Sequence, residues 1–82
     1  MDTFEKVKDV IESQFLKKMR MSNLKKALRL GLTNNQVVKI NYVTDLNEKS
    51  INSMVLSINE ENVAIDKSLE IPIRAIKEIS FN

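Results

Sequence analysis

The chain of 82 residues has the length of one domain, and its composition, 43% hydrophobic and 29% charged, is typical of a folded globular protein. It contains no cysteine and no histidine, which excludes disulfide bonds and thiolate metal sites and removes the commonest general base. A single glycine cannot build a phosphate-binding loop of the Walker or Rossmann kind. We therefore expect one domain, residues 1–82, that is not an enzyme and needs no cofactor or metal ion.

The N-terminus lacks the basic start and the continuous apolar run of a signal peptide. No apolar stretch approaches the roughly 18 residues that a membrane-spanning helix requires. Together with the absence of cysteine, these features predict a cytoplasmic protein that does not insert into a membrane.

The net charge of +2 is divided unevenly along the chain. Residues 13–44 contain seven bases and no acid, whereas residues 45–82 contain seven acids and four bases. The simpler interpretation of the basic segment is a solvated helix face, and the functional one is contact with phosphates or with an acidic protein. The candidate contact residues are Lys17, Lys18, Arg20, Lys25, Lys26 and Arg29.

Residues 3–20 are predicted to form an amphipathic helix, because apolar residues recur there at spacings of three and four. A break is expected near Met21, and Ser22 can act as the N-cap of a second, short helix. Gly31 lies where a helix C-cap favours a residue with positive φ. Residues 1–31 are therefore predicted to form a helix pair.

From residue 36 the apolar period changes to two, and β-branched residues become frequent, which predicts strands. Pro72 cannot donate a hydrogen bond to a sheet, so a strand should end there and be followed by a 3₁₀ turn over residues 72–75. The expected strands are residues 37–43, 51–58, 63–65, 69–71 and 76–81. The predicted fold class is α+β, with the helix pair packed on a five-stranded antiparallel sheet or small barrel formed by residues 36–81.

The predicted core takes its side chains from both parts of the chain. Its members are Phe4, Val7, Ile11, Phe15, Leu24, Leu28, Val38, Ile40, Leu56, Ile58, Val63, Ile65, Ile71, Ile76 and Ile79.

The tail Ile71-Pro72-Ile73-Arg74-Ala75-Ile76-Lys77-Glu78-Ile79 has the form apolar-Pro-apolar followed by Ile-x-x-Ile. In this it resembles the YolD-like family of short bacterial proteins, which ends in a small SH3-like or Sm-like barrel. The likeness covers about residues 36–81, although the glycine usual in the second strand of such barrels is replaced near Asn52-Ser53. The resemblance implies a non-catalytic regulatory or interaction module, in a family often linked with bacterial DNA-damage functions.

A second resemblance leads to a different function. Residues 4–11 look like the first helix of an acyl carrier protein, and Ser50 lies at a position that distantly resembles its modified serine. This alternative requires a helix over residues 50–58. Glu48-Lys49 before the serine and the basic character of the chain both depart from the acidic carrier proteins.

Two functions remain open from the sequence. We favour a regulatory module that binds a protein partner, because the C-terminal half is acidic and few aromatic residues are available for stacking on bases. The alternative is a nucleic-acid-binding module that contacts the phosphate backbone through the basic segment 17–29. A homodimer is also expected, because short strands leave sheet edges and residues 1–20 offer a long helix for pairing.

Overall fold

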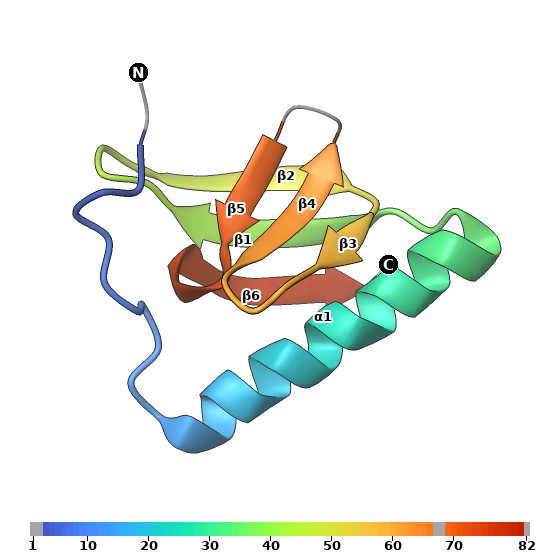
Figure 1. Ribbon diagram of the computed structural model, residues 1–82, viewed down its shortest axis with the longest axis horizontal. Coiled ribbons are helices and arrows are strands. Elements are labelled where there is room, and N and C mark those ends of the chain that lie inside the picture. Colours follow the sequence, from blue (N-terminus) through green and yellow to red (C-terminus); the bar gives the residue numbers. More distant parts are fainter. Residues whose placement is uncertain (1–2, 67–68, 82) are drawn as a thin grey trace.

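The computed structural model describes residues 3–66 and 69–81, which form one α-helix followed by strands in two antiparallel sheets (Figure 1). The first sheet has the order β2-β1-β6, with β1 (Val38–Val43), β2 (Glu48–Ser53) and β6 (Ile76–Phe81). The second has the order β3-β4-β5, with β3 (Ser57–Ile58), β4 (Asn62–Asp66) and β5 (Leu69–Pro72). The α+β class is therefore confirmed, whereas the helix pair on a five-stranded barrel or sheet is wrong.

One continuous helix, α1 (Gln14–Asn34), replaces the predicted pair. Ser13 is its N-cap, and the Ser13 side chain accepts a hydrogen bond of 3.3 Å from the backbone N–H of Leu16. The helix passes through Met21 without a break. The buried residues of α1 explain this continuity, because their spacing of four, three and four places them on a single stripe. These residues are Arg20, Leu24, Ala27 and Gly31.

Gly31 lies inside α1 rather than at its C-cap, so the prediction of a positive φ there is wrong. The C-cap is Asn35, which has a φ of 54° and whose N–H donates to the carbonyl oxygen of Gly31 at 3.1 Å. Gly31 instead permits a close approach to the chain between β2 and β3. A Cβ atom on Gly31 would lie 3.1 Å from the carbonyl oxygen of Val55.

Residues 3–13, which we call the strap, are not helical. Figure 1 shows the strap running along one side of the two sheets before it enters α1. The three-to-four spacing of its apolar residues predicted a helix. The strap backbone instead forms hydrogen bonds with Asp45, in the turn between β1 and β2, and with Arg74 of η1 (Ile73–Ala75), the 3₁₀ turn between β5 and β6.

The predicted strand 51–58 is divided into β2 and β3, and β2 begins within the predicted loop. At the division Val55 is buried, whereas Leu56 is 40% exposed. The side chain of Ser53 donates a hydrogen bond of 2.8 Å to the carbonyl oxygen of Ile65 and so connects the end of β2 to β4. The last strand and the 3₁₀ turn before it are confirmed.

One hydrophobic core joins α1, both sheets and η1. Eight members of the predicted core are buried in it, namely Leu24, Val38, Ile40, Val63, Ile65, Ile71, Ile76 and Ile79. Phe4, Val7, Leu28 and Ile58 pack against it. Phe15 and Leu56 are exposed, which contradicts the prediction for these two. Within the described residues, no helix is long and apolar enough to span a membrane.

Candidate functional site

Three of the candidate bases lie on the solvent face of α1 and form what we call the basic stripe, Lys18, Lys25 and Arg29. Lys18, Ser22, Lys25 and Arg29 follow one another at intervals of four, three and four residues, which places them in one line along the helix. All three bases are exposed, α1 contains no acid, and no ion pair joins them to any residue of the described ranges. The stripe is therefore free to attract an anionic partner.

The two remaining candidate lysines, Lys26 and Lys17, have partners within the chain. The Nζ atom of Lys26 lies 4.6 Å from the centre of the Phe81 ring, a cation–π contact between α1 and the end of β6. The Nζ atom of Lys17 lies 3.9 Å from the Oδ2 atom of Asp9 in the strap.

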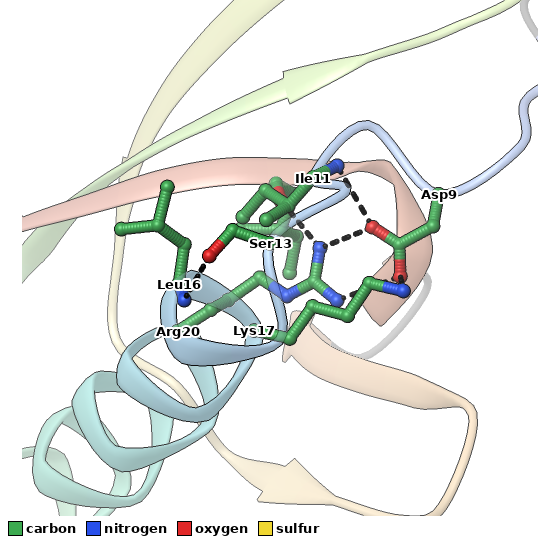
Figure 2. A network of polar contacts seen from close by, with 7 residues as sticks. Asp9, Ile11, Ser13, Leu16, Lys17 and Arg20 are labelled. Atoms are coloured by element: carbon green, nitrogen blue, oxygen red, sulfur yellow. Dashed lines mark hydrogen bonds and ion pairs between the residues drawn. The ribbon is translucent and has the colours of Figure 1, made fainter.

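Arg20 differs from the other candidate residues because it is buried. Its guanidinium donates two hydrogen bonds to the carboxylate of Asp9, at 3.0 and 2.9 Å, and one to the carbonyl oxygen of Ile76 at 3.0 Å (Figure 2). These contacts connect α1 to the strap and to the first residue of β6. Arg20 thus has a structural role, and its burial disfavours the predicted contact with an external phosphate or acidic protein.

Asp9 is stabilised as a carboxylate by this network. Partial burial raises the pKa of Asp9, but the hydrogen bonds from Arg20 and from the backbone N–H of Ile11 outweigh that effect, together with the positive charges of Arg20 and Lys17. The pKa of Asp9 therefore lies below its ordinary value. Figure 2 shows the carboxylate held between these donors at the entry to α1.

A group of exposed apolar side chains lies on the first turns of α1. We call Phe15, Leu16 and Met19 the apolar patch; they are 69%, 50% and 45% exposed. They lie outside the buried stripe of the helix, so folding of the chain does not cover them. Sequence analysis missed the patch because it placed Phe15 in the core. The sequence did contain a signal of this exposure, because the apolar residues at the start of α1 are too many to lie on one face of a helix.

The patch borders a groove of about 400 Å³ between α1, the strap and β6. Leu16 and Met19 line it from the helix, Ile11 from the strap and Ile79 from β6. Arg20, Asn23, Lys77 and Glu78 supply its polar lining. Its walls thus combine an apolar surface with a few polar groups, as binding sites for other molecules do.

Four acidic residues, Asp45, Glu48, Glu60 and Glu61, lie in or next to turns between strands. Asp45 binds the strap, and Glu48 forms an ion pair of 2.9 Å with Lys77. Glu60 and Glu61 are exposed at the turn between β3 and β4. In the part of the chain that the structure describes, no group of three or more acidic side chains is arranged to hold a metal ion.

Ser50 is an exposed residue of β2, paired with Asn41 of β1. The acyl-carrier alternative requires a helix over residues 50–58, and this segment instead contains β2, a turn and β3. The alternative therefore loses its structural basis.

Comparison of the chain with protein-family models, with characterised proteins and with solved structures gives no match. The resemblance to the YolD-like family stays a prediction, and the function must be argued from the surface itself.

Proposed function

We propose that this protein is a non-catalytic interaction module that binds a partner protein through the apolar patch and the adjoining groove. The observation that carries the proposal is the exposure of Phe15, Leu16 and Met19 beside a groove with apolar lining. Large apolar side chains that are exposed together favour an interaction site, because leaving them in water is unfavourable. A partner that buries them gains that free energy on binding.

The charge of α1 defines the chemistry of the partner. The basic stripe runs along the same helix as the patch, and α1 carries no acid that would neutralise it. A partner with acidic residues around an apolar centre complements both features. Its acids would increase the association rate and its apolar side chains would supply affinity.

The alternative, binding of nucleic acid, is supported by the alignment of Lys18, Lys25 and Arg29 in one row. Two features favour the protein partner over it. The neighbouring patch is apolar and offers no charge or hydrogen bond to a phosphate backbone. Glu78, which lines the groove, would repel phosphates. Among the exposed residues of α1 only Phe15 is aromatic, so stacking on successive bases has little support.

Site-specific photo-crosslinking in the native cell tests the proposal. A photoreactive amino acid at Phe15 should capture a protein, and the doubly substituted chain Leu16→Ser/Met19→Ser should lose that product. Leu46→Ser is the matched control, because Leu46 is 67% exposed on the turn between β1 and β2, away from the patch. The far-ultraviolet circular dichroism of each variant verifies its fold. A crosslinked product unaffected by the double substitution would contradict the proposal.

A titration with duplex DNA and with RNA at physiological salt separates the two functions. We expect no saturable binding. Micromolar binding that weakens in Lys18→Ala/Lys25→Ala/Arg29→Ala, with a flatter dependence on salt, would instead establish the nucleic-acid function. Leu16→Ser/Met19→Ser is the control in this titration, because it leaves every base in place.

A further inference from the structure

The strap is bound to the rest of the protein largely through its own backbone. It forms no regular secondary structure. Residues 3–8 are held by groups of the β1–β2 turn and of η1, whereas Asp9 is held by Arg20 of α1. We call Tyr42, Asp45 and Arg74 the strap site.

Arg74 binds three backbone groups of the strap. Its Nε donates to the carbonyl oxygen of Val7 at 2.8 Å, and its Nη2 donates to that of Phe4 at 2.9 Å. The carbonyl oxygen of Arg74 accepts a hydrogen bond of 2.9 Å from the N–H of Val10. None of these contacts depends on a strap side chain.

Asp45 binds the other end of the strap. Its backbone N–H donates to the carbonyl oxygen of Thr3 at 2.9 Å, and its Oδ1 accepts from the N–H of Lys6 at 2.8 Å. Its Oδ2 accepts a hydrogen bond from the hydroxyl of Thr3, the one side-chain polar contact between the strap and this site.

Two strap side chains add an apolar component. Phe4 and Val7, three residues apart, pack against the hydrophobic core. The Phe4 ring lies 6.2 Å from the Tyr42 ring, centre to centre, at an angle of 42°. The N–H of Val7 donates a hydrogen bond of 3.1 Å to the carbonyl oxygen of Phe4, so residues 4–7 form a turn. The site therefore combines recognition of a turn backbone with places for two apolar side chains.

We propose that the strap site is a peptide-binding site, occupied here by residues 3–8 of the same chain. Its ligand class is a turn-forming segment of another protein in which an aromatic residue is followed, three positions later, by a branched aliphatic residue, as Phe4 and Val7 are here. Contacts to backbone atoms are available from any such turn, and the paired apolar positions select among them.

The exposure of the polar groups allows exchange. The Arg74 side chain is exposed and Asp45 is half-exposed, so both can be hydrated when residues 3–8 leave. Departure of these residues leaves neither charge in the protein interior, and Asp9 can stay bound to the buried Arg20. Because the strap is tethered, its effective concentration is on the order of millimolar, and a free peptide binds well only when the tethered strap is weakened.

A fluorescent peptide with the sequence of residues 3–12 is the probe, and the full chain is the receptor. Phe4→Ser in the receptor weakens the tethered strap and should raise affinity for the peptide by about tenfold or more over the unsubstituted chain. Adding Arg74→Ala to that receptor should abolish the gain. Lys6→Pro is a second receptor, which removes the N–H that Asp45 accepts and leaves both apolar side chains in place.

Changes in the peptide provide a control that cannot affect folding of the receptor. A peptide with Phe4→Ser should not bind, whereas one with Lys8→Ala should bind as the original does, because Lys8 is exposed. No binding to either weakened receptor while both remain folded, or equal binding of the Phe4→Ser peptide, would overturn the proposal. The groove variant Leu16→Ser/Met19→Ser should leave peptide binding unchanged, so this test is independent of the proposed function.

Discussion

At the scale of single residues, Arg20 has the largest structural role. It is the member of the basic segment that lies on the buried stripe of α1, and its guanidinium bonds to both the strap and β6. Its Nε is the one buried side-chain nitrogen or oxygen in the described residues without a hydrogen-bond partner. The two Nη groups thus provide all the polar compensation for burying this charge.

Replacement of Arg20 by Met keeps an apolar stem and removes these bonds. We expect the free energy of unfolding to fall by about 1–3 kcal/mol, because Asp9 and the Ile76 carbonyl lose a charged donor. Urea denaturation measures the change. Arg29→Met on the exposed face is the control and should change stability by less than about 0.5 kcal/mol. Equal stability of the two variants would refute the role of Arg20.

The lowered pKa of Asp9 predicts loss of stability in acid. A carboxyl group with a depressed pKa in the folded state stabilises the fold at pH values above its unfolded pKa of about 3.9. That contribution disappears as the pH falls through the lower, folded pKa. Urea midpoints should therefore decrease below about pH 4.

Asp9→Asn should make this decrease shallower. A hydrogen bond from the Thr3 hydroxyl also lowers the pKa of Asp45, so part of the acid dependence should remain in the variant. The control is Glu60→Gln, at an exposed carboxyl group on the β3–β4 turn. Identical profiles for Asp9→Asn and the unsubstituted chain would show that the Arg20 contact does not contribute.

At the scale of elements, the end of α1 is determined by Asn35. Its φ of 54° is a left-handed conformation that Asn tolerates and Gly adopts without strain. The backbone N–H of Asn35 then closes the last turn by bonding to Gly31. Gly31 itself permits contact of the helix with Val55, which helps to position α1 against the linker between the sheets.

Two substitutions at Asn35 test this helix end. Asn35→Ala should lower the free energy of unfolding by about 1 kcal/mol, because a Cβ atom without a compensating polar group disfavours the left-handed region. Asn35→Gly should keep the stability within about 0.5 kcal/mol of the original. Thermal denaturation followed by circular dichroism measures both. A larger loss with Gly than with Ala would contradict the assignment of this C-cap.

At the scale of the whole molecule, a single core predicts a single unfolding transition. The buried residues of α1, both sheets and η1 belong to one cluster, so no sheet has a separate core to retain. Tyr42 is the only tyrosine, and the chain has no tryptophan. The ring of Tyr42 is buried in this cluster.

Tyrosine fluorescence therefore reports the first sheet, while far-ultraviolet circular dichroism is dominated by α1. We expect the two signals to give the same midpoint and slope in urea. Leu24→Ala, at a fully buried position of α1, should shift both curves together by an equivalent of about 2–4 kcal/mol. Separate transitions for the two signals would show that α1 and the sheets unfold independently.

The expected homodimer stays a prediction at this scale. The outer strand β2 is polar or charged at every position except Ile51, and β5 is short and ends in Pro72, features that hinder pairing of these two edges between chains. Sedimentation at micromolar concentration that gives only the 9.4 kDa species would refute the homodimer.

The sequence by itself determined the local properties of this protein. The change of apolar period near residue 36 separated helix from strands, Pro72 located the 3₁₀ turn, and the absence of acids in residues 13–44 predicted a basic helix. The exposure of Lys18, Lys25 and Arg29 also followed from helical spacing. Each of these features depends on residues that are close together in the chain, so the local sequence pattern was sufficient to predict it.

The tertiary structure decided which local alternative is adopted where two were compatible with the sequence. Phe4 and Val7 pack against the core as predicted, but from a strap that is not helical, because Arg74 and Asp45 hold its backbone in place of intrahelical hydrogen bonds. Burial of Arg20 depends on the distant Asp9 and Ile76, and exposure of the apolar patch depends on which helix face meets β6. These contacts join residues far apart in sequence, so periodicity could not reveal them.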